Sequence, residues 1–314
     1  SSLVAQPSLD KEYNLFRTGD KLIKQQIEYK SPGEAGKDRV WDFSQQKSID
    51  DAYELEYFSW DEDSTIIGRE HCTLYKYKES GDSLFCLGYE NATTLMNYIQ
   101  PELMFTFPLR YQSQSRGYFY GKGEYSRQLG LTVQGVTTTI ADAYGKMILP
   151  EGDTLNHVLR LYTIKRMVEK NRSLTYDTEN DSIIVTNKDS IEYYLNTDSI
   201  VYQVETYRWY ADGYRYPVFE TIQTTVYKYK EPLSISNTAF YYTTEEQYYG
   251  LKNDSENIVR RELIKEKECR EKEAQRNKNK QKKEKGLETE EKRISYSVSF
   301  DENGSSIALD YQLN

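Results

Sequence analysis

The sequence predicts a mainly β protein: an antiparallel β-sandwich or barrel-like domain, followed by a charged helical or disordered spacer and a terminal β-hairpin. From about residue 20 to 235, apolar and polar residues alternate in short runs separated by Gly, Asn and Asp turns. Thirty of the 314 residues are tyrosine, which favours strands. The turn spacing and the scarcity of helical patterns indicate a sandwich or a barrel.

The first strands are marked by strict alternation. "AYELEYF" (52–58) alternates aromatic or aliphatic residues with glutamate, and "TLYKYKE" (73–79) alternates tyrosine with lysine. "SLFCLGYE" (83–90) follows a Ser-Gly-Asp turn and predicts the returning strand of a hairpin. Folding this hairpin about Ser80–Gly81 places Cys72 and Cys86 on opposite faces, so we predict that they form no disulfide.

Later strands are longer. "TTTIADAYGKMILP" (137–150) and "HVLRLYTIKRMV" (157–168) are joined by a Pro-Glu-Gly-Asp turn. "SIIVT", "SIEYYL" and "SIVYQVETYRWY" then predict three strands within residues 182–210. Residues 207–220 predict a hairpin around Asp212–Gly213, with Pro217 at an edge or a bulge.

Composition changes at about residue 251, so we divide the chain into a β-rich domain (1–250), a charged spacer (251–293) and a terminal hairpin (294–314). Apolar residues of the spacer are confined to its first part, and we expect its first turns to dock on the β domain through them: Ile258, Val259, Leu263 and Ile264. The last segment has an Asn-Gly turn, and two strands alone are marginally stable, so it must pair with something else or begin a further domain.

Composition also limits the function. A net charge of -9 argues against a nucleic-acid partner, because phosphate binding relies on concentrated Lys and Arg. No apolar run is long enough to predict a transmembrane segment.

Catalytic and metal motifs are absent. His71 and His157 are the only histidines, and strand alternation directs His157 and Arg160 to opposite faces with Asp153 in the turn. We therefore predict no catalytic residue, no cofactor and no metal site. Acidic residues are abundant, so a pair of glycosidase carboxylates stays open as an alternative.

Three stretches resemble exported proteins of Bacteroidetes: "NLFRTGDKLIKQQIEYKSPGEAGKDRVWDFS" (14–44), "ADAYGKMILPEGDTLNHVLRLYT" (141–163) and "YRWYADGYRYPVFET" (207–221). The resemblance implies an exported protein, extracellular, on the outer-membrane surface or periplasmic. Residues 294–314 resemble the opening strands of the C-terminal sorting domain of the type IX secretion system, although they lack its usual Asn-Pro.

A further pattern of that lineage is Asp, then Ser or Thr, then an aliphatic residue or threonine, which resembles an O-glycosylation site. It makes six residues candidate glycan acceptors: Ser64, Ser83, Thr154, Ser182, Ser190 and Ser199. Each also fits a turn that leads into a strand.

Three functions follow as hypotheses. The first is an exported, non-catalytic β domain that binds a glycan, such as a polysaccharide, or a cell-envelope protein, with tyrosines as the platform. The second is a lipocalin-like carrier of a small apolar ligand inside a barrel. The third is a carboxylate-dependent glycan hydrolase, which requires two convergent acids about 5–9.5 Å apart.

Overall fold

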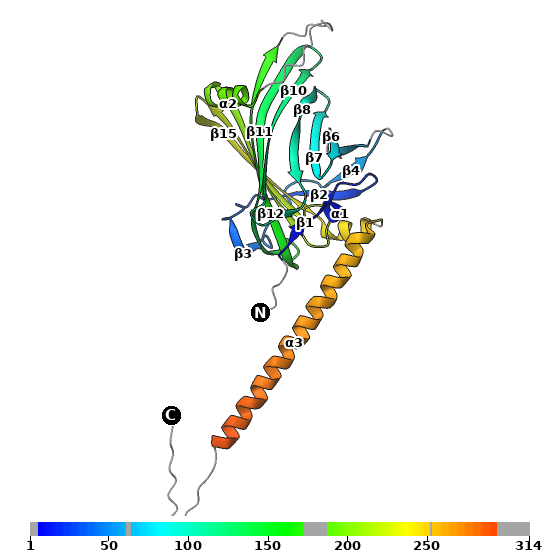
Figure 1. Cartoon of the computed structure of the whole chain (residues 1–314), viewed down its shortest axis with the longest axis vertical. Coiled ribbons are helices and arrows are strands. Elements are labelled where there is room, and N and C mark those ends of the chain that lie inside the picture. Colours follow the sequence, from blue (N-terminus) through cyan, green and yellow to red (C-terminus); the bar gives the residue numbers. More distant parts are fainter. Residues whose placement is uncertain (1–5, 61–63, 173–186, 252, 294–314) are drawn as a thin grey trace, which may run out of the picture. The chain divides into compact units, whose positions relative to one another are not determined.

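The computed structural model describes residues 6–60, 64–172, 187–251 and 253–293. It has a mainly β architecture in which antiparallel strands close into a barrel (Figure 1). Closure arises because β10 pairs with β8 on one side and with β11 on the other. The predicted β-rich, barrel-like domain followed by a charged helix is therefore confirmed.

Around the barrel the strands follow the order β10 (Gln114–Tyr125), β8 (Thr94–Thr106), β7 (Ser83–Glu90), β6 (Thr73–Ser80), β5 (Thr65–Glu70), β4 (Tyr53–Phe58), β2 (Lys21–Ile27), β15 (Glu231–Tyr242), β14 (Phe219–Lys228), β13 (Ile200–Ala211), β12 (Thr154–Arg172) and β11 (Leu129–Ile148). Outside this ring, β3 (Gly36–Asp42) pairs in parallel with β11. A short pair joins β1 (Ser8–Leu9) to β9 (Leu109–Arg110), and α1 spans Lys11–Asn14.

Both faces of β12 are buried over residues 158–161. Leu159 and Leu161 pack with Leu84 of β7 in the opposite wall, so this face points into the barrel. Val158 instead packs with Trp209 on the outer face. Leu159 and Val158 therefore belong to different cores, one inside the barrel and one outside it, which explains why the strand shows no simple apolar–polar alternation.

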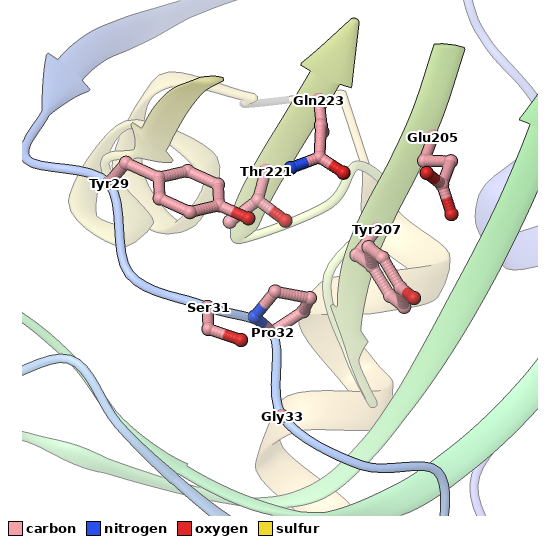
Figure 2. A pocket seen from close by; sticks show the side chains of 8 residues that line it. All are labelled: Tyr29, Ser31, Pro32, Gly33, Glu205, Tyr207, Thr221 and Gln223. Carbon is pink, nitrogen blue, oxygen red and sulfur yellow. The ribbon is translucent and has the colours of Figure 1, made fainter. Parts of the chain in front are cut away.

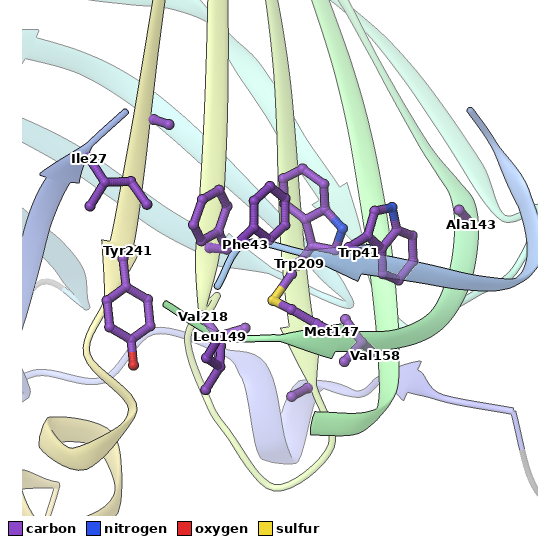
Figure 3. Close-up of a cluster of buried hydrophobic side chains, with 13 residues drawn as sticks. Ile27, Trp41, Phe43, Ala143, Met147, Leu149, Val158, Trp209, Val218 and Tyr241 are labelled. Atoms are coloured by element: carbon purple, nitrogen blue, oxygen red, sulfur yellow. The ribbon is translucent and has the colours of Figure 1, made fainter. Parts of the chain in front are cut away.

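The outer core is covered by the segment around β3 (Figure 3). Trp41 meets Trp209 edge to face with ring centroids 6.0 Å apart, and Phe43 stacks on Phe219 at 3.9 Å. Gly145 of β11 makes this approach possible, because a Cβ there would lie 1.9 Å from the carbonyl oxygen of Arg39. Residues 36–43 thus form a second layer over β11 to β14.

One predicted strand is wrong. "SIEYYL" lies in a helix, α2 (Lys188–Thr197), which begins where the Asn187 side chain accepts a hydrogen bond from the Asp189 amide. Ile191 and Leu195 are four residues apart, lie on one face of the helix and are buried against the outside of the barrel. "SIIVT", at 182–186, lies outside the described residues.

Two predicted turns differ in detail. The hairpin at 207–220 has a tight turn at Asp212–Gly213, but β13 and β14 first pair at Trp209 and Phe219, so the connection is longer than a two-residue turn. In the β6–β7 hairpin, Ser80 pairs with Ser83, and the same register sets Cys86 opposite Tyr77, with a bulge only beyond that pair. The predicted register was wrong, because the turn is centred after Gly81.

No disulfide forms between the cysteines, as predicted: Cys86 is buried, whereas Cys72 and Cys269 are exposed free thiols. Cys72 lies in the turn between β5 and β6 rather than in a strand.

The charged segment is helical, and α3 spans Ser255–Arg293 after a short π-helical turn, η1 (Glu246–Gly250). The chain divides into two compact units, residues 1–261 and 262–314. In the first unit, Asp254 and Asn257 are completely buried, whereas Val259 is 53 % exposed. The helix start therefore docks as expected, but through polar residues. The terminal hairpin predicted at 294–314 lies outside the described residues.

Candidate functional site

A pocket of about 260 Å³ lies on the outer face of the barrel, between β13, β14 and the segment that leads from β2 to β3 (Figure 2). Its lining residues are Tyr29, Ser31, Pro32, Gly33, Glu205, Tyr207, Thr221 and Gln223. Aromatic rings, hydroxyls, an amide and one carboxylate therefore surround a single small cavity.

Strand alternation builds the floor of this pocket. Glu205 and Tyr207 are two residues apart on β13, so their side chains share the outer face. Across the sheet, Glu205 lies directly opposite Gln223, and Tyr207 lies opposite Thr221 on β14. The four side chains form two adjacent cross-strand pairs.

Arg160 holds the opposite wall in place. Its side chain is only 1 % exposed, and its Nε and Nη2 donate to the two carboxylate oxygens of Asp142 at 2.9 and 2.8 Å. The remaining nitrogen, Nη1, donates to the carbonyl oxygens of Pro32 and, at 3.1 Å, of Gly33. This buried guanidinium ties the pocket segment to β12.

Tyr207 and Glu205 are oriented by their neighbours. The ring of Tyr162 stacks on that of Tyr207 with centroids 4.7 Å apart. The Tyr162 hydroxyl donates to Oε1 of Glu205 at 2.7 Å, and Nε2 of Gln203 donates to Oε2 at 3.2 Å. The carboxylate is thus held by two neutral donors.

Burial raises the pKa of Tyr29, and the charge of Glu205 raises it further. The pKa of Tyr207 is also raised by burial, against the opposing effect of Arg160. Both phenols therefore stay protonated at neutral pH and can donate or accept a hydrogen bond.

Thr221 is 1 % exposed, and its hydroxyl, which faces the pocket in Figure 2, is buried without a hydrogen-bond partner among the described residues. Such a hydroxyl is costly to bury unless a partner arrives. The pocket is chemically suited to a small polar ligand that has both apolar faces and hydroxyl or amino groups.

His157, Asp153 and Arg160 do not converge. Arg160 faces the outer core, where its guanidinium lies over the rings of Trp41 and Trp209. The ladder between β11 and β12 shifts register between Leu155 and Val158, so simple alternation does not carry through His157, and the predicted face of His157 stays a prediction. Sequence reasoning missed that Arg160 anchors a pocket. His71, the other histidine, packs against the ring of Tyr53.

Inside the barrel, two carboxylates converge on one lysine. Lys24 Nζ lies 2.9 Å from Oε1 of Glu220 and also pairs with Glu70, while Arg208 contacts the second oxygen of Glu220. Burial opposes the ionisation of Glu220, but the charges of Lys24 and Arg208 outweigh it and lower its pKa to about 2. Both acids are neutralised by ion pairs, and Glu220 is closed to solvent.

The candidate glycan acceptors differ in accessibility. Ser64 and Thr154 are exposed before β5 and at the start of β12. The other described acceptors, Ser83, Ser190 and Ser199, are half-buried, and the Ser83 hydroxyl is 2.8 Å from that of Thr106. Ser182 lies outside the described residues. Modification at these positions stays a prediction.

The described residues contain no cluster of three or more His, Cys, Asp or Glu side chains arranged to hold a metal ion. None of the described helices combines the length and the hydrophobicity that crossing a bilayer requires.

The pocket was missed by the sequence interpretation, although six of its eight lining residues belong to two stretches singled out there, 14–44 and 207–221, and Arg160 belongs to 141–163; Glu205 and Gln223 lie just outside them. In comparisons with known proteins, no family model, no curated protein and no solved structure matches this chain.

Proposed function

We propose that this chain is a non-catalytic binding protein whose outer-face pocket takes one sugar unit of a glycan. The observation that carries the proposal is the convergence of Tyr29, Tyr207, Glu205 and Thr221 on one small cavity. The C–H face of a sugar packs against the electron-rich face of a tyrosine ring, and its hydroxyls pair with carboxylate, amide and hydroxyl groups.

The size of the pocket sets the scale of the ligand. Sites for drug-sized molecules measure roughly 300–1,000 Å³, and this cavity measures about 260 Å³. A single sugar unit at a chain end or branch suits such a volume better than an extended chain does.

Binding is favoured over hydrolysis because the pocket lining contains one carboxylate, that of Glu205. Glycoside hydrolysis in most families needs two acids flanking the scissile bond. The convergent pair inside the barrel, Glu70 and Glu220, is engaged by Lys24 and is not available to a substrate.

The carrier alternative has weaker support. The barrel would have to hold an apolar ligand beside the inner-face charges of Arg208 and Lys165, whose side chains remain 28 % and 21 % exposed. Placing apolar atoms against solvated charges strips those charges of water without replacing it, which disfavours binding.

Export stays part of the proposal. Its support is the resemblance of residues 14–44, 141–163 and 207–221 to exported Bacteroidetes proteins. Cell fractionation of the native host tests it, and recovery only from the cytoplasm would remove the exported role.

The binding proposal is tested by screening the full chain on a glycan array and measuring the hits by calorimetry. Single-sugar affinity is expected in the millimolar range, about −4 kcal/mol. Tyr29→Ala removes one aromatic wall and should abolish binding. Tyr193→Ala is the matched control, because Tyr193 is an exposed tyrosine on α2, outside the pocket lining. No glycan bound by the unmodified chain, or equal loss in both variants, would overturn the proposal.

A further inference from the structure

The carboxylate of Glu205 has no cationic partner in the described part of the chain. Its two oxygens accept from the neutral donors Tyr162 and Gln203 at 2.7 and 3.2 Å. The residue is half-buried against the pocket. A partly desolvated carboxylate that is hydrogen-bonded but not charge-compensated favours a cation beside it.

The guanidinium beside the pocket is already neutralised. Arg160 lies 4.8 Å from the ring centroid of Tyr207, but Asp142 binds its guanidinium with two hydrogen bonds. The remaining guanidinium nitrogen is directed to the carbonyls of Pro32 and Gly33. Arg160 therefore fixes the wall of the pocket and leaves the charge of Glu205 unmatched.

The pocket walls also suit a cation. Tyr29 and Tyr207 lie on opposite sides of the cavity in Figure 2, and tyrosine faces attract ammonium groups through the ring quadrupole. The unpartnered Thr221 hydroxyl offers an acceptor at the bottom of the site. Glu205 and the two tyrosine rings together form a site for an amino group on a sugar-sized ligand, and the Thr221 hydroxyl is left for a hydroxyl of the same ligand.

We propose that the pocket selects a hexose bearing a free, protonated amino group over its N-acetylated and neutral counterparts. The inference rests on the proposed sugar-binding function and names the ligand class of the same site. The ammonium would contact the Glu205 carboxylate between the two tyrosine rings, while the remaining hydroxyls pair with Thr221 and the Gln223 amide.

The test is calorimetry of the full chain with glucosamine, N-acetylglucosamine and glucose at about pH 6, where an amine of this basicity is charged. Glucosamine is expected to bind at least about tenfold more tightly than the other two, since it alone gains a charge-assisted hydrogen bond and a cation–π contact. Equal or weaker binding of glucosamine overturns this inference and leaves the sugar-binding function standing. Failure of all three sugars also overturns this inference, whereas the sugar-binding function is overturned only when no glycan on the array binds.

Glu205→Gln tests whether the preference for glucosamine depends on the charge of residue 205 or only on the shape of its side chain. The variant keeps the size of the side chain and should reduce the preference for glucosamine to less than about twofold while glucose still binds. Glu34→Gln is the control, because Glu34 is an exposed acid on the loop that carries Ser31 to Gly33 but lies outside the pocket lining. Retention of the full preference in Glu205→Gln, or equal loss of it in Glu34→Gln, would refute the assignment of Glu205.

Discussion

Replacing Arg160 with methionine tests the central structural claim about the pocket. The change removes a guanidinium that is 1 % exposed and leaves Asp142, whose side chain is 12 % exposed, without its partner. Methionine fills much of the volume but cannot donate a hydrogen bond. The effect of Arg160→Met on stability therefore reports mainly the lost ion pair and the two lost carbonyl contacts, and not a loss of packing.

Removing one partner of a buried ion pair costs about 3–5 kcal/mol, because the other charge stays buried and uncompensated. The carbonyls of Pro32 and Gly33 add little, since this segment is partly exposed and water can replace Arg160 there. We therefore expect Arg160→Met to lower the free energy of unfolding by about 3–5 kcal/mol. Sugar binding should be lost as well, because residues 31–33 are no longer tied to β12.

The assay is urea unfolding at constant pH, with the midpoint compared at unchanged m-value. Arg166→Met is the matched control: Arg166 lies on the same strand and face and donates only a 3.4 Å hydrogen bond to the carbonyl of Leu195. It should cost less than about 1 kcal/mol. In the double variant Arg160→Met/Asp142→Asn, much of the loss should be recovered. A loss below about 1 kcal/mol for Arg160→Met, or no recovery in the double variant, refutes the reasoning.

Three further predictions concern single groups. The folded state lowers the pKa of Glu220 from 4.5 to about 2, so the ionised carboxylate stabilises the fold fully above pH 4.5 and this contribution is lost as the pH falls toward 2. Acid unfolding measures this loss, and Glu220→Gln should flatten the dependence of the unfolding free energy on pH. Burial raises the pKa of the Cys86 thiol to about 12, so a thiol reagent should label the exposed Cys72 and Cys269 in the folded protein and Cys86 only after denaturation. Rapid labelling of all three cysteines in the folded protein contradicts this prediction. His157→Gln should leave the affinity for sugar unchanged, because His157 does not line the pocket. A tenfold loss of affinity in calorimetry would show that His157 is a functional residue.

Local pattern was enough to predict several strands. "AYELEYF" and "TLYKYKE" became β4 and β6 within one residue of the predicted ends, because each has one face toward the barrel interior and alternates accordingly. "SIEYYL" was misassigned because a six-residue stretch of mixed apolar and polar residues is too short to distinguish the period of a strand from that of a helix. The spacing of Ile191 and Leu195 indicates a helix only when the capping Asn187 and the packing partners on β11 to β13 are considered with it.

The candidate site was less predictable than the strands. Alternation places Glu205 and Tyr207 on one face of β13, and that much is readable from the chain. Their partners Thr221 and Gln223 depend on the register of the β13–β14 hairpin, which the long connection obscures. The wall at residues 29–33 comes from more than 170 residues away, and no local pattern specifies that approach.

The sequence by itself determined the class of the protein: a tyrosine-rich, antiparallel β domain followed by a charged spacer. These properties depend on periodicity and composition, which are local. The tertiary structure alone decided that the sheet closes at β10–β11 and that Arg160 of β12 anchors the loop over β13 and β14. Strand partners and buried ion pairs depend on contacts between distant residues, and an alternating pattern specifies which face of a strand is buried without specifying what covers it.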